Sequence, residues 1–187
     1  PPDINQGDVE FSVVNGNIIF GLLAIKGLGR SAAEELVENR KRNGPYKSLY
    51  DLCERIDPKA VSKSALERAI MAGAMDSFAQ PFAHRAQLIA ALPGALASAA
   101  GTQEDRKRGQ RSIFDLMEES TNDTGTPKQE VALPNVPRWS NTELLKYEKE
   151  ALDFYLTSHP LAEYDSALKR YANGSISNMM QAKAGTE

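Results

Sequence analysis

Two glycines separated by one residue, Gly27 and Gly29, constrain the fold of this chain more than any other feature of its sequence. Apolar residues precede the pair, and Leu28 lies between its two members. An apolar face with helical spacing follows the pair: Ala33, Leu36 and Val37. Glycine lets the backbone turn sharply and keeps side chains off the outer surface of the turn. The pattern therefore predicts a helix-hairpin-helix unit, in which a tight turn joins two packed helices.

The backbone N–H groups of such a turn, with those at the start of the second helix, can point at a phosphate. Lys26 and Arg30 would flank that anion site with positive charge. The predicted contacts to a DNA backbone are Lys26, Gly27, Leu28, Gly29, Arg30 and Ser31. A second interpretation stays open, because the same glycines could simply join two helices, with Leu28 in the core and no ligand outside.

A degenerate copy of the unit follows, without the glycine pair. We expect a helix over Ser48–Arg55, a turn over residues 57–61, and a helix that Ser62 caps and Gly73 ends. Paired units of this kind can hold the two DNA backbones beside the minor groove without reading the sequence. The phosphate contacts predicted in this copy are Lys59, Ser62 and Lys63. Ordinary solvated surface explains these three residues equally well.

The regions on either side add a hairpin and further helices. Asn15-Gly16 between two short apolar runs predicts a β-hairpin at the start of the chain. Residues 82–100 have a helical composition, although Pro93 is expected to kink or split that helix. Ser140 and Glu143 have capping-box spacing, and Pro160 is placed to start a last helix. The predicted fold class is mostly α: a tandem helix-hairpin-helix domain preceded by a small β-hairpin and followed by a further helical segment.

Composition excludes several classes of protein. The 22 Lys and Arg residues against 25 Asp and Glu residues give a net charge of −3, which excludes a globally basic nucleic-acid coat. Positive charge is nevertheless concentrated in residues 26–68, with ten bases and seven acids. One cysteine and two histidines exclude an intramolecular disulfide and a Cys/His zinc site. We expect no bound metal, no membrane contact and a cytoplasmic protein, and the two ends of the chain suggest a fragment of a longer polypeptide.

Several segments resemble the bacterial C-family replicative DNA polymerases, the polymerase III alpha subunits. They are Pro1-Pro2-Asp3-Ile4-Asn5, Ala24-Ile25-Lys26-Gly27-Leu28-Gly29, Gly44-Pro45-Tyr46-Lys47-Ser48-Leu49, Asp51-Leu52-Cys53-Glu54-Arg55, Ala72-Gly73-Ala74-Met75-Asp76-Ser77, Tyr147-Glu148-Lys149-Glu150 and Tyr155-Leu156-Thr157-Ser158-His159-Pro160-Leu161. The chain departs from the family at Asp153, where members usually carry glycine, and we expect this to affect the helix end there.

The resemblance implies a division of the chain and a second binding element. In the family, a short peptide at the position of Gln110, Ser112, Ile113 and Phe114 docks on the sliding clamp. The glutamine would hydrogen-bond at the rim of an apolar pocket that the aliphatic and aromatic side chains fill. The implied regions are 1–20, a β-hairpin at the end of the fingers; 21–78, the tandem helix-hairpin-helix; 79–109, a helical extension; 110–137, the clamp peptide and an acidic linker; and 138–187, a helical segment that leads to a missing downstream domain.

The implied function is sequence-independent binding of duplex DNA and tethering to the sliding clamp during DNA replication. The parent chain would be a DNA-directed DNA polymerase, a nucleotidyltransferase that uses Mg²⁺, whereas this segment is expected to hold no catalytic residue and no cofactor. Its partners would be double-stranded DNA, the clamp, and other domains and subunits of the replicase. The alternative is a structural or protein-interaction module whose hairpins pack on neighbouring domains without contacting DNA.

Overall fold

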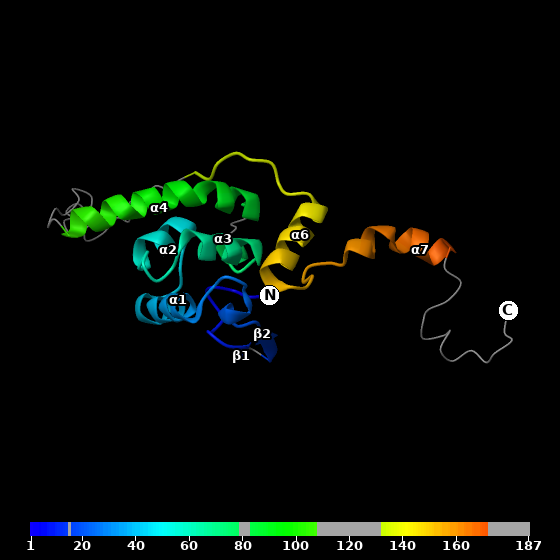
Figure 1. Ribbon diagram of the computed structural model, residues 1–187, viewed down its shortest axis with the longest axis horizontal. Coiled ribbons are helices and arrows are strands. Elements are labelled where there is room, and N and C mark those ends of the chain that lie inside the picture. Colours follow the sequence, from blue (N-terminus) through cyan, green and yellow to red (C-terminus); the bar gives the residue numbers. More distant parts are fainter. Residues whose placement is uncertain (15, 79–82, 108–131, 172–187) are drawn as a thin grey trace, which may run out of the picture.

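The molecule is mostly helical, with one two-stranded antiparallel sheet near its start (Figure 1). A computed structural model describes residues 1–14, 16–78, 83–107 and 132–171. Strands β1 (Ser12–Val14) and β2 (Asn17–Ile19) pair so that Val13 faces Ile18, and Gly16 in the turn has a φ of 78°. The predicted hairpin and the mostly-α fold class are therefore confirmed.

Figure 1 shows α4 lying along α2 and α3, with α1 on the other side of α2 and α6 beside α3. The 3₁₀ helices and α-helices of the described residues are η1 (Leu22–Ala24), α1 (Arg30–Asn43), α2 (Leu49–Arg55), α3 (Lys63–Met71), η2 (Asp76–Phe78), α4 (Arg85–Lys107), α6 (Asn141–Leu152), η3 (Pro160–Tyr164) and α7 (Asp165–Tyr171). The last two extend away from the other helices. In the described part of the chain, no helix is both long enough and apolar enough to cross a membrane.

Serine side chains cap three of these helices. Ser48, Ser62 and Ser140 each accept a hydrogen bond from the backbone N–H three residues further on, at the starts of α2, α3 and α6. Glu143 completes the predicted capping box at α6. Helix α1 ends at Gly44, whose φ of 81° is a conformation that glycine adopts readily. The three serine-capped starts are those that the sequence predicted.

The apolar faces of the helices meet in one core. Its largest fully buried side chains are Ile4, Leu22, Ile25, Leu36, Leu49, Leu52, Ile56, Leu66, Ile70, Met75, Leu88 and Leu92. Cys53 also lies in this core, where burial raises the pKa of its thiol to about 12. The residues predicted to line the inner faces of α1 and α3 are therefore buried, and the tandem units pack as one body.

Two local expectations differ from the structure. Of the kink or split expected at Pro93, the split is wrong, because α4 runs unbroken from Arg85 to Lys107. The segment before the first hairpin forms the short 3₁₀ helix η1 and not an α-helix. The amides of Leu22 and Leu23 donate to the carbonyls of Asp8 and Val9. These bonds to an earlier part of the chain hold the segment, which does not continue as an α-helix.

Candidate nucleic-acid interface

The first hairpin, residues 25–29, is anchored by its apolar members. Ile25 and Leu28 are 1% and 3% exposed, and the Leu28 amide donates to the Ile25 carbonyl at 3.1 Å. Between them Gly27 has a φ of 82°, in the left-handed region that favours glycine. Leu28 therefore holds the turn against the core while Gly27 allows the backbone to reverse, and the glycines remain on the outside.

Helix α1 starts from this hairpin without a side-chain cap. Gly29 is its N-cap residue, and a Cβ atom built there meets nothing within 4 Å. The amides of Arg30, Ser31 and Ala32 have no acceptor among the described residues, as expected for the first turn of an uncapped helix. The arrangement leaves open space beside Gly29, next to N–H groups that carry the positive end of the helix dipole.

Both predicted cations of the first hairpin are exposed and paired with carboxylates. The Lys26 Nζ lies 2.6 Å from the Asp153 Oδ1, and the Arg30 Nη2 lies 2.6 Å from the Glu10 Oε1. More than half of each of these four side chains is accessible to solvent. Exposed pairs of this kind contribute about 0–1 kcal/mol, so an incoming anion can exchange with the carboxylates at little cost.

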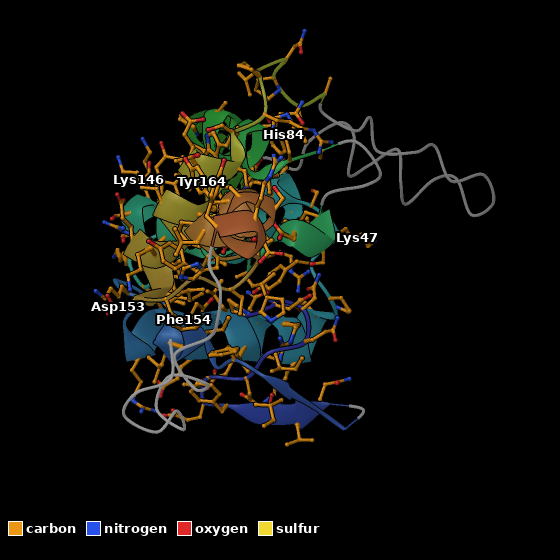
Figure 2. The ribbon with its side chains drawn as sticks, turned by 90° about the vertical axis from the view of Figure 1, so that its right-hand side faces the viewer. Lys47, His84, Lys146, Asp153, Phe154 and Tyr164 are labelled. Carbon is orange, nitrogen blue, oxygen red and sulfur yellow. The ribbon has the colours of Figure 1, made fainter. Side chains whose placement is uncertain are left out.

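A shallow hollow joins the first hairpin to α3 and α6. Its lining residues are Lys26, Gly27, Ser64, Arg68, Lys149, Glu150 and Asp153. Arg68 lies 3.8 Å from Glu150, and Lys149 donates to the backbone carbonyl of Asp153. Figure 2 shows Asp153 and Phe154 where α6 ends, on the opposite side of the molecule from Lys47. Sequence reasoning missed Ser64, Arg68, Lys149 and Glu150, because no local pattern brings α3 and α6 to this turn.

Helix α6 also holds the first hairpin through the backbone. The Lys26 amide donates to the Ala151 carbonyl at 2.8 Å, so this N–H group does not point outward as the sequence suggested. Asp153 follows as the C-cap residue with a φ of 71°, which explains why glycine suits this position. The end of α6 therefore fixes the side of the hairpin that precedes its glycines.

A buried ion pair fastens α6 to the rest of the protein. The fully buried Glu148 accepts hydrogen bonds from Arg85 at 3.0 Å, from the Leu156 amide at 3.2 Å and from the Thr157 amide at 3.0 Å. Burial by itself opposes the charged carboxylate, but these bonds, with one from the Thr157 hydroxyl, hold the pKa of Glu148 below its usual value. Arg85 also pairs with Asp76 at 2.7 Å. The network keeps α6 in place beside the hairpin.

The second hairpin, residues 56–62, satisfies several of its own amides. The Lys59 amide donates to the Asp57 side chain at 2.9 Å, and the amides of Ala60 and Val61 donate to the Asp57 carbonyl. Ser62 caps α3, and Lys63 lies 3.6 Å from Glu67. All three predicted contacts of this hairpin are exposed, but the amides of Lys59, Ala60 and Val61 are already used within the turn.

The remaining predictions concern the clamp peptide, metal binding and His159. Gln110, Ser112, Ile113 and Phe114 lie outside the described residues. Among the residues that the structure describes, no group of three His, Cys, Asp or Glu side chains is arranged to hold a metal ion. His159 caps η3, because its Nδ1 accepts from the Leu161 amide at 3.2 Å.

Comparison with known proteins agrees with this arrangement. The family described as the helix-hairpin-helix motif matches residues 1–88. The DNA polymerase III subunit alpha of Deinococcus radiodurans is 39% identical over 96% of this chain, which covers 13% of that protein. The same subunit of Pasteurella multocida is 36% identical over 99% of the chain, and that of Caulobacter vibrioides 36% over 100%, each over 15% of the relative. Over nearly its whole length the chain is therefore similar to one segment of these DNA polymerase III alpha subunits, of which it spans only about 13–15%.

Proposed function

We propose that this segment holds the sugar-phosphate backbone of duplex DNA at the first hairpin. The observation that carries the proposal is the uncapped start of α1, where the first amides have no acceptor among the described residues and the space beside Gly29 is open. A phosphate oxygen at this position would accept hydrogen bonds from the amides of Arg30 and Ser31. Lys26 and Arg30 would supply the charge, and the contact would be independent of base sequence because it involves the backbone alone.

The parent polypeptide would be a DNA polymerase that transfers nucleotides, as the names of the relatives indicate. Such chemistry uses carboxylates that hold Mg²⁺, and the described residues of this segment do not fit that group, since they bring no three metal ligands together. The role proposed for this segment is therefore to hold DNA in place, while the reaction takes place in another part of the polypeptide.

The second proposed function is tethering to the sliding clamp through Gln110, Ser112, Ile113 and Phe114. The support is the residue pattern, in which a glutamine precedes an aliphatic-aromatic pair that can fill an apolar pocket. Two weak attachments on one polypeptide raise the effective concentration of each partner for the other. DNA binding and clamp binding together would prolong the time that the polymerase stays on its template.

One observation favours the alternative role, a packing module that does not contact DNA. Both the amide and the side chain of Lys26 are engaged by α6, so part of the first hairpin already serves an internal contact. In that role the hairpins would fix the arrangement of neighbouring domains, and the cations would remain paired with their carboxylates. DNA affinity separates the two roles.

The deciding experiment measures the fluorescence anisotropy of a labelled duplex against protein concentration over a salt series. We expect the logarithm of the affinity to fall with the logarithm of the salt concentration, by about 0.9 per phosphate contacted. The double substitution Lys26→Ala, Arg30→Ala should reduce both the affinity and this slope. The matched control, Arg42→Ala with Lys47→Ala, removes the same charge from exposed sites and should leave the slope nearly unchanged, since Arg42 lies about 18 Å along α1 from Arg30 and Lys47 lies on the opposite side of the molecule from Asp153 (Figure 2). Equal effects of the two double variants would contradict the proposal, and no binding at low salt would favour the packing module.

The clamp proposal has its own test. Phe114→Ala should abolish binding to the sliding clamp, because the pocket loses its aromatic anchor. The same variant should bind duplex DNA with unchanged affinity, since the hairpin is untouched. Equal clamp affinity of the variant and the original chain would refute the tether.

A further inference from the structure

We propose that Asp153 is a built-in competitor of DNA at the first hairpin, a carboxylate that occupies the position of a backbone phosphate and thereby weakens DNA binding. The inference rests on the proposed function of that hairpin and adds a residue that regulates it. Its basis is the hollow described above, in which the side chains of Lys26, Arg68 and Lys149 meet those of Glu150 and Asp153.

The ion pair is close and directional. The Asp153 carboxylate lies 2.6 Å from the Lys26 ammonium group, and Lys26 is the neighbour of Gly27 in the turn. Glu150 neutralises Arg68 in the same hollow at 3.8 Å. Two carboxylates from one end of α6 therefore face cations of the hairpin and of α3, which is the charge pattern that DNA phosphates would present there.

The local structure of α6 does not require an aspartate at this position. The φ of 71° at residue 153 suits glycine, and aspartate and asparagine tolerate it less well. A carboxylate at the C-terminal end of a helix also meets the negative end of the helix dipole. The helix end is closed by a backbone bond from the Asp153 amide to the Lys149 carbonyl, which any residue could make. Among the described residues, the only side-chain contact recorded for the carboxylate is with Lys26.

The consequence is an exchange of partners on DNA binding. Lys26 must release Asp153 before it can pair fully with a phosphate, and the freed carboxylate then repels that phosphate at short range. Because both side chains are more than half exposed, the exchange is fast and its cost is modest. We expect Asp153 to lower the affinity for duplex DNA about fivefold at low salt, the upper range for an exposed pair.

The test compares two variants that each remove one negative charge. Asp153→Asn retains a residue that tolerates positive φ, whereas Glu38→Gln removes a carboxylate that is also about two-thirds exposed and ion-paired, with Arg42 on α1. Glu38 lies eight residues beyond Arg30, about 12 Å along the helix. Anisotropy with a labelled duplex in low salt should give about fivefold tighter binding for Asp153→Asn than for Glu38→Gln. Equal affinities of the two variants would overturn the inference.

Two further measurements identify the cause. Asp153→Gly should reproduce the gain, which separates the loss of the carboxylate from any property of asparagine. In a Lys26→Met background the gain from Asp153→Asn should shrink, since the competitor acts through Lys26; an undiminished gain would contradict that mechanism.

If the original chain binds DNA and Asp153→Asn does not change its affinity, the proposal of a competing carboxylate fails and the DNA-binding function stands. If neither the original chain nor any of these variants binds DNA, the proposed function itself fails.

Discussion

The two hairpins share a layout of two helices and a turn, and they differ in what satisfies the backbone amides. At the second hairpin, Asp57 and Ser62 accept hydrogen bonds from the amides of Lys59 and Ala65. At the first hairpin, Gly29 stands at the position of the capping serine, so the amide of Ala32 has no side-chain acceptor. The comparison teaches that a side-chain cap stabilises a helix by occupying its first turn, where an anion would also bind. A turn built from glycine gives up that stabilisation and keeps the groups available.

The buried network of Glu148 and Arg85 keeps α6 beside the first hairpin, and removing it should have the largest effect on stability. Glu148→Gln leaves Arg85 buried with one carboxylate fewer, so the free energy of unfolding should fall by about 3 kcal/mol in a urea titration. Glu150→Gln, a change at an exposed pair on the same helix, should alter it by less than about 1 kcal/mol. Similar losses in the two variants would mean that the buried network does not hold α6.

The same network predicts an acid dependence. The folded-state pKa of Glu148 lies below its usual value, so the unfolded chain binds a proton at this residue more readily. The stability contributed by Glu148 is therefore complete above a pH of about 4.3, the usual pKa of a glutamate, and is lost as the pH falls through the lower folded value. Urea midpoints measured over this range should fall more steeply for the original chain than for Glu148→Gln. Parallel curves would exclude Glu148 as the source.

The turn of the first hairpin should tolerate change at one glycine and not at the other. Gly27→Ala puts a Cβ atom on a residue with a φ of 82°, which should cost about 1–2 kcal/mol of unfolding free energy. Gly29→Ala, with a φ of −67° and no neighbour within 4 Å of its Cβ, meets no steric obstacle and should cost only about 0.5–1 kcal/mol, because alanine is a poorer N-cap than glycine. Thermal unfolding of both variants would show the difference, and equal shifts would argue against the backbone assigned to Gly27.

Exchanging the caps should produce the smallest changes in stability. Ser62→Ala leaves the Ala65 amide without its acceptor and should destabilise by about 1 kcal/mol. Gly29→Ser should stabilise α1 by a few tenths of a kcal/mol and lower its affinity for duplex DNA, because the new hydroxyl accepts from an amide of the first turn. Stabilisation without loss of DNA affinity would separate the open amides from DNA binding.

The sequence predicted what depends on neighbouring residues, including the turn at Gly27, the serine caps and the apolar faces. The split expected at Pro93 was wrong: the missing N–H costs a helical bond, but Leu88, Leu92 and Ala95 bury their side chains on either side. That burial outweighs a cost of about 3 kcal/mol. The contact of Lys26 with α6 could not be predicted, because it joins residues that are 127 apart and no periodicity reports such a pairing.

Because the Lys26 amide donates to the Ala151 carbonyl, hydrogen exchange at this amide depends on whether α6 stays in contact with the hairpin. The contact between α6 and the hairpin closes a long loop of the chain. The entropy gained when this contact opens grows only slowly with the length of the loop. Detachment of α6 would expose the Lys26 amide to solvent while the core amides of α1 and α3 remain protected. The hydrogen-exchange rate of this single proton therefore reports how often α6 leaves the hairpin, and a slower rate in the presence of DNA would indicate that the two are held together in the complex.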